Sequence, residues 1–130
     1  MTTQSAKEVA LGFIEDARNG RHAEAMARLA PDVVYDVVAP APYGGIYDRA
    51  GLIALSTDTV SRLATPIHLT VKGVTAEGER VAVEAEGHAV TKSGKPHFNR
   101  FHFLFVVRDG VIVETREYLD TVLYFELKNS

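Results

Sequence analysis

The sequence predicts an α+β fold in which N-terminal helices lie against one face of a curved, mainly antiparallel sheet. Three observations indicate this fold class. Helical periodicity runs through the first part of the chain, four strand-like segments follow Pro66, and turn-forming clusters separate those segments. The 130 residues fit a single domain spanning 1–130, since no linker, internal repeat or low-complexity tract divides them.

The first helix begins at a capping box. Ser5 and Glu8 have the spacing at which each side chain accepts a hydrogen bond from the other residue's backbone amide. Apolar residues then recur at helical spacing until Asn19-Gly20, a pair typical of a helix C-terminus. Two further helices are expected, from about His22 to Leu29 and from an N-cap at Asp48 to about Leu63.

The strands are predicted from β-branched and alternating segments. Val33–Val38 is one such segment, and it is followed by a loop rich in proline and glycine, APAPYGGIY. Four successive strands are then expected at residues 67–75, 80–91, 97–107 and 111–120.

The pairing of the last three strands determines which residues face the core. Residues 92–94 and 108–110 each suit a three-residue hairpin loop, which would place Phe101 opposite both Ala85 and Glu117. On the other face Arg100 would lie opposite Glu86 and Tyr118, and His102 opposite Glu84 and Arg116; opposite charges across strands stabilise a pair by roughly 0.2–1 kcal/mol. The odd-numbered face is therefore the expected core face. Two-residue loops would move these residues to the other face.

Glu117 is the main candidate for chemistry because this register places a carboxyl group among apolar or small residues. Ala85, Gly87 and Ala89 would leave space on the same face, as a ligand cavity requires. Burial should raise the pKa of Glu117, which suits a general acid or base. Asn99 is expected on this face too, either orienting a substrate or water or satisfied by the backbone.

Composition excludes several other classes. The net charge of −3 and the pI near 5.9 give no basic surface for nucleic acid or anionic membrane. There is no cysteine, the five histidines lack metal-binding spacing, and no GxSxG motif is present, so neither a metal site nor a serine hydrolase is expected. Without an apolar leader or spanning segment, the expected location is cytoplasmic.

Three segments carry a resemblance to a known family. These are the helical region AKEVALGFIEDARNGRHAEAMARLAPDVVYD, the YGG…DRAGL entry into the third helix, and FLFVVRDGVIVETREYLDT. They resemble the nuclear transport factor 2-like superfamily, in its SnoaL-like polyketide cyclase and ketosteroid isomerase branch. The resemblance implies a cone-shaped mixed sheet wrapped around helices, with a deep apolar pocket. It also implies a homodimer through the outer sheet face, where Leu104, Val106 and Val113 interrupt the charges.

The resemblance also suggests site residues. Asp36 falls at the general-base position of ketosteroid isomerase, although a strand-end carboxylate bonding the next loop is the alternative. Phe13 and Phe103 stand where that enzyme has its oxyanion donors, so steroid isomerase activity is not expected. Glu117 falls near an acid of limonene epoxide hydrolase and Tyr35 near its Tyr, but Ala85 and Gly87 interrupt the rest of that set. SnoaL-type cyclases use a single acid near Glu117, and the sequence departs least from them.

The sequence therefore supports two hypotheses. The first is a cofactor-independent enzyme acting on an apolar oxygenated small molecule by cyclisation, isomerisation, dehydration or epoxide opening, with Asp36 as base and Glu117 as its acid or water-activating partner. Its expected substrate-binding residues are Phe13, Tyr35, Asn99, Phe101 and Phe103. The second is a non-catalytic module of the same fold that binds a small molecule or pairs with a partner. Asp120 is expected to point outward and cap the TVLYFE segment.

Overall fold

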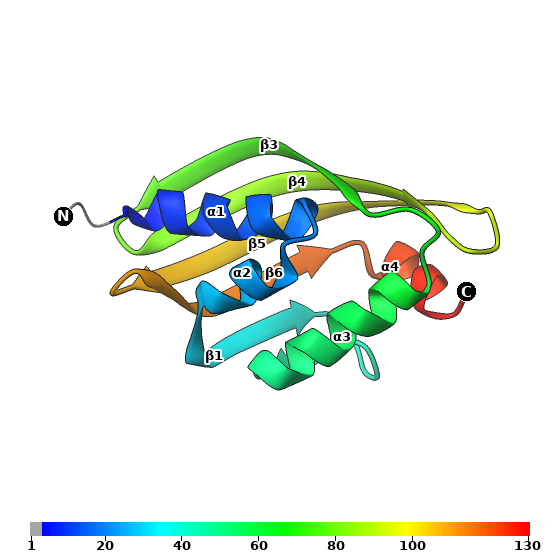
Figure 1. The fold of residues 1–130 in the computed structure, drawn as a ribbon, viewed down its shortest axis with the longest axis horizontal. Helices are drawn as coiled ribbons and strands as arrows, with labels where there is room; N and C mark the ends of the chain where they lie inside the picture. Colours follow the sequence, from blue (N-terminus) through cyan, green and yellow to red (C-terminus); the bar gives the residue numbers. More distant parts are fainter. Residues whose placement is uncertain (1–3) are drawn as a thin grey trace.

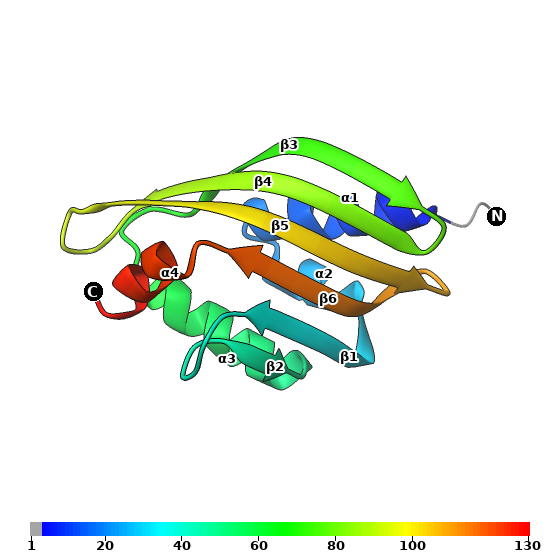
Figure 2. The ribbon, with the colours of Figure 1, turned by 180° about the vertical axis from the view of Figure 1, so that it is seen from behind.

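The computed structural model describes residues 4–130 as a bent six-stranded sheet with helices against one face (Figure 1). The view from behind shows the other face of the sheet uncovered by helices (Figure 2). In chain order the elements are α1 (Ala6–Arg18), α2 (His22–Ala27), β1 (Leu29–Val38), β2 (Gly45–Tyr47), α3 (Arg49–Ser61), β3 (His68–Glu77), β4 (Arg80–Val90), β5 (Pro96–Arg108), β6 (Val111–Leu119) and α4 (Thr121–Lys128). The predicted α+β class and mixed sheet are confirmed.

The strands are ordered β2-β1-β6-β5-β4-β3. Neighbouring strands are antiparallel except β1 and β6, which are parallel. This parallel pair joins the early and late parts of the chain, placing Tyr35 opposite Thr115 and Val37 opposite Glu117. Residues on β1 and β6 can therefore contribute to the same site.

The helix caps and boundaries predicted from the sequence are largely confirmed. Ser5 Oγ accepts the Glu8 amide at 3.1 Å while Glu8 Oε1 accepts the Ser5 amide at 3.3 Å, and Gly20 follows α1 with a φ of 73°. Asp48 caps α3 by accepting the Gly51 amide at 2.7 Å. The second helix ends at Ala27 rather than Leu29, because β1 already begins at Leu29.

The register of β4 and β5 is confirmed: Ala85 pairs with Phe101, and a three-residue loop closes the hairpin. The register predicted for β5 and β6 is wrong by two residues, since Phe101 pairs with Leu119 and Phe103 with Glu117.

Two departures from the predicted hairpin combine to produce this shift. Asp109 and Gly110, with φ values of 54° and 79°, form a two-residue turn of the kind that favours left-handed residues. A bulge at Val113 then adds one residue on β6, between the pairs Val107–Ile112 and Val106–Glu114. The two changes together restore the alternation, so Glu117 still lies on the helix-covered face.

Aromatic side chains form much of the contact between α1 and the sheet. Phe101, Phe103 and Phe105 stack along β5 with ring centroids 5.5 and 5.7 Å apart, and Phe13 of α1 meets Phe105 edge-on at 5.7 Å. Offset and edge-on aromatic pairs stabilise a core beyond their area burial. These contacts fix α1 over the middle of the sheet.

The C-terminal segment forms a helix that the sequence indicated only through its cap. Asp120 is exposed and its Oδ1 accepts the amides of Val122 and Leu123 at 3.0 and 3.2 Å, as predicted for a cap. Helix α4 then lies beside the C-terminal end of α3 (Figure 1). Within residues 4–130, no helix has the length and apolar character needed to cross a membrane.

Candidate functional site

A cavity of about 500 Å³ lies between the sheet and the helices. Phe13 of α1 and Leu52 and Leu55 of α3 form part of its wall, opposite Phe101 and Phe103 of β5. Helix α4 adds Tyr124 and Leu127, and β6 adds Leu119 and Glu117. The volume and the mainly apolar wall suit a small organic ligand.

The central polar feature of this cavity is a hydrogen bond between Tyr35 and Glu117. The buried Tyr35 hydroxyl of β1 donates to Glu117 Oε1 of β6 at 2.6 Å, and both residues line the cavity. Burial raises the pKa of Glu117, while the hydrogen bond from Tyr35 and the positive charge of Lys128 oppose this increase. Burial, followed by the charge of Glu117, raises the pKa of Tyr35 well above its usual value. Tyr35 therefore stays protonated and acts as a hydrogen-bond donor, while burial destabilises the ionised form of the Glu117 carboxyl group.

The structure places Asp36 away from this cavity. Side chains alternate between the two faces of a strand, so Tyr35 and Asp36 cannot both face the helices. Asp36 lies opposite Arg116 and the exposed Ile46, on the outer face of the sheet. The pairing of Asp36 with Glu117 across one cavity, expected from the sequence, is therefore not formed.

Asn99 lines the cavity, but backbone groups satisfy most of its side chain. Its Oδ1 accepts the amides of Arg100 at 2.8 Å and Asp120 at 2.9 Å, and its Nδ2 donates to the Asp120 carbonyl at 3.1 Å. Of the two alternatives left open by the sequence, the structure shows the backbone-satisfied one. Asn99 fixes the junction between β6 and α4, and so the position of the wall that α4 forms.

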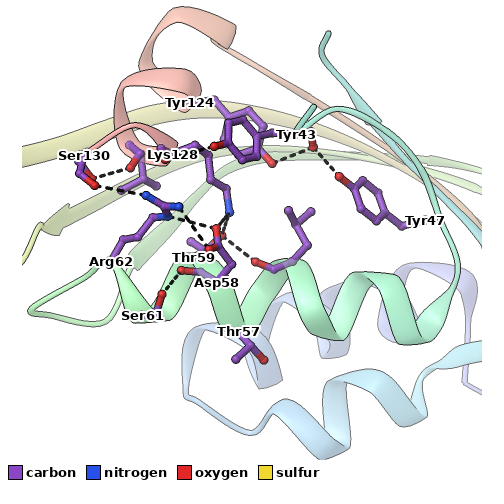
Figure 3. Close-up of polar contacts among 12 residues, drawn as sticks. Tyr43, Tyr47, Thr57, Asp58, Thr59, Ser61, Arg62, Tyr124, Lys128 and Ser130 are labelled. Atoms are coloured by element: carbon purple, nitrogen blue, oxygen red, sulfur yellow. Dashed lines mark hydrogen bonds and ion pairs between the residues drawn. The ribbon is translucent and has the colours of Figure 1, made fainter. Parts of the chain in front are cut away.

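Helix α4 is held against α3 by a buried lysine (Figure 3). Lys128 Nζ donates to Asp58 Oδ2 at 2.8 Å and to Thr59 Oγ1 at 2.7 Å, and the lysine side chain is 0% exposed. Asp58 also pairs with Arg62, at 3.1 Å. A lysine two residues from the C-terminus gave no sequence signal for burial, so this contact was missed.

Tyr124 lines the cavity and was not identified from the sequence. Its hydroxyl donates to the Tyr43 carbonyl at 3.1 Å, and Tyr47 donates to the same oxygen at 2.8 Å (Figure 3). Burial, followed by the charge of Glu117, raises the pKa of Tyr124. The sequence feature that could have indicated Tyr124 is the apolar run after the Asp120 cap.

No cluster of three or more His, Cys, Asp or Glu side chains within residues 4–130 could hold a metal ion.

Comparison with solved structures identifies the fold as nuclear transport factor 2-like. An NTF2-like protein of unknown function from Burkholderia pseudomallei matches with a TM-score of 0.83 at 21% identity, over 98% of this chain and 100% of its own. IdmH from Streptomyces antibioticus, a proposed polyketide cyclase, matches with a TM-score of 0.81 at 20% identity, over 98% and 100%. TerC, co-crystallised with polyporic acid, matches with a TM-score of 0.81 at 21% identity, over 96% and 98%.

Within this fold, the chain belongs to the SnoaL-like domain family, whose profile matches residues 10–115. A comparison with curated proteins gives no significant match. The matched region includes Tyr35 and most of the cavity-lining sheet, while Glu117 lies two residues beyond it.

Proposed function

We propose that this protein is a cofactor-independent enzyme in which Glu117 transfers protons on an apolar, oxygenated small molecule. The single observation that carries the proposal is the hydrogen bond between Tyr35 and Glu117 inside an apolar cavity. Desolvation raises the pKa of Glu117 above its ordinary value, as suits a carboxyl group that accepts a proton and then returns it. The similarity to IdmH, a proposed polyketide cyclase, supports a carbonyl-rich substrate.

The reaction class that this site suits best is proton abstraction from a carbon beside a carbonyl group. Glu117 would accept the proton, and the Tyr35 hydroxyl would be free to donate to the enolate oxygen once the carboxylate is neutralised. That one donor would take the place of the oxyanion hole missing at Phe13 and Phe103. The resulting enolate could be reprotonated in an isomerisation or attack a second carbonyl in a ring closure.

The test uses 2-tetralone, a cyclic ketone fused to a benzene ring and bearing exchangeable α-protons, in D₂O. Wild-type protein should accelerate deuterium incorporation, followed by proton NMR, and Glu117→Gln should lose that acceleration. Asp36→Asn is the matched control because Asp36 lies on the outer face, and it should retain wild-type exchange. Equal exchange by wild type and Glu117→Gln would reject Glu117 as the proton-transfer group for this substrate class.

The second candidate is a binding module without catalysis, and the position of Asp36 favours it. With Asp36 outside, the cavity keeps one of the two acids expected from the sequence. This alternative predicts that Glu117→Gln binds ketone ligands as tightly as wild type and that neither protein accelerates exchange.

We further propose a homodimer through the outer sheet face, supported by exposed apolar residues at Val34, Ile46 and Tyr118. A monomeric mass in light scattering would contradict that assembly.

A further inference from the structure

His97 is a cavity residue that the proposed proton transfer does not use. It lies on β5, two residues before Asn99, and its partly buried side chain lines the cavity. Its strand partner Ala89 belongs to a small apolar cluster with Leu63 and Leu127. His97 therefore stands where the sheet meets α4 and the segment after α3.

The position of His97 is far from Glu117 along the sheet. Glu117 pairs with Phe103, and His97 precedes Phe103 by six residues on the same strand. Six residues of extended strand span about 20 Å, a distance that the bend of the sheet shortens somewhat. Between His97 and Glu117, the cavity wall is formed by the apolar side chains of Phe101 and Leu119. Asn99 also lies there, and its side chain is already hydrogen-bonded to backbone groups.

The imidazole of His97 is available for a ligand. Among residues 4–130 it forms no hydrogen bond, whereas Thr59, Asn99 and Tyr124 in the same wall bond to other protein groups. Arg18 and His22 also touch the cavity but are exposed at its rim. Within residues 4–130, Ser56 of α3 is the other partly buried polar side chain of the cavity wall that forms no hydrogen bond. Its short hydroxyl reaches less far than an imidazole.

We infer that His97 is a specificity-determining residue that binds an oxygen at the end of an elongated apolar ligand remote from Glu117. This inference rests on the proposed function and adds the substrate class: a long, largely apolar molecule with a hydroxyl or carbonyl oxygen at each end. Burial lowers the pKa of His97, an effect that the charge of Glu126 opposes, so the neutral ring offers one N–H donor and one acceptor. A neutral imidazole suits a hydroxyl or a carbonyl equally.

The probes for this inference are two p-terphenyl derivatives, one with a hydroxyl at one end and one with a hydroxyl at both ends. Calorimetric titration of wild type should give tighter binding of the dihydroxy compound, by about two- to tenfold, the usual contribution of one neutral hydrogen bond. His97→Phe should remove this preference, because phenylalanine keeps the ring but cannot hydrogen-bond. His97→Gln should recover part of it.

His102→Phe is the matched control, since His102 lies on the same strand but is exposed on the opposite face. It should keep the wild-type preference. A preference that survives in His97→Phe would overturn the inference while leaving the role of Glu117 intact. Failure of both probes to bind wild type would overturn the inference and also count against an apolar ligand in this cavity. Loss of deuterium exchange in Glu117→Gln, measured separately, bears on the proposed function alone.

Discussion

The hydroxyl of Tyr35 donates a 2.6 Å hydrogen bond to Glu117, joining two parallel strands whose residues are 82 positions apart in the chain. Tyr35 faces the cavity from β1 and Glu117 from β6, so the pair exists only when the sheet is complete. The short distance is typical of an O–H donor on a carboxylate, a bond stronger than that between neutral groups. Its effect on the acidity of Glu117 can be measured directly.

Tyr35→Phe should raise the pKa of Glu117 further, because the lost hydrogen bond stabilises the ionised carboxylate and holds the pKa down. The same change should lower the free energy of unfolding by roughly 1–3 kcal/mol at neutral pH, the usual effect of removing a hydrogen bond to a charged group. Carboxyl carbon NMR measures the pKa and urea unfolding the stability. An unchanged or lower pKa in the variant would show that Tyr35 does not stabilise the carboxylate.

Glu117→Gln should stabilise the protein at neutral pH and lose this advantage in acid. Burial raises the folded-state pKa of Glu117 above its unfolded value, so ionising this group costs stability. The cost is absent below the unfolded pKa, near 4.5, and grows as the pH rises through the folded value. The amide oxygen of the substituted side chain can still accept the Tyr35 hydroxyl. Thermal unfolding from pH 4 to pH 8 checks the prediction, with Asp36→Asn as the control on the outer face.

Features of the fold that depend on local chemistry could be predicted from the sequence. The capping box at Ser5, the cap at Asp48 and the three-residue loop of the β4–β5 hairpin each require only residues close together in the chain. The shift between β5 and β6 could not be predicted in this way. Val113, where β6 bulges, is β-branched like the preceding Val111 and Ile112, so the local sequence does not mark the bulge.

The candidate site was predicted in part, for a similar reason. Glu117, Phe101 and Phe103 follow from alternation along β5 and β6, and all three line the cavity. Asp36 was selected through family resemblance, although its neighbour Tyr35 already occupied the inward position of the same strand. The burial of Lys128 could not be predicted because it depends on Asp58, which is 70 residues away in the chain. From the sequence alone, Asp58 has the features of an ordinary surface carboxylate. Contacts of that kind depend on the assembled tertiary structure.

Gly87→Ala should destabilise the protein by about 1 kcal/mol or somewhat more and weaken ligand binding. A Cβ at this position would lie 2.9 Å from Cε2 of Phe101 and 3.1 Å from Cγ2 of Ile67, both closer than ordinary contacts. Both neighbours line the cavity, so relieving the overlap would move them into it. Urea unfolding and titration with a terphenyl probe measure the two effects. Wild-type affinity in a folded variant would show that the ring can move without narrowing the cavity.

The two members of the Lys128–Asp58 pair should differ sharply in their effect on stability. Asp58→Ala leaves the 0%-exposed lysine without its counter-charge and should cost about 1–3 kcal/mol, less than for a fully buried pair because the Asp58 side chain is 41% exposed. Lys128→Met should cost less, since it removes the buried charge and Asp58 keeps its pair with Arg62. Urea unfolding of both single variants and of the double variant measures the coupling.

In the double variant, Asp58→Ala should add little to Lys128→Met, because no buried ammonium remains to be left unpaired. Glu79→Ala is the control, as it breaks an exposed pair with Arg108 and should change stability little. Because Lys128 holds the helix that carries Tyr124 and Leu127, Asp58→Ala should also weaken terphenyl binding, whereas Glu79→Ala should not. Additive losses in the double variant would mean that the two side chains stabilise α4 independently, and the cavity wall would then depend on the aromatic contacts of α4 instead.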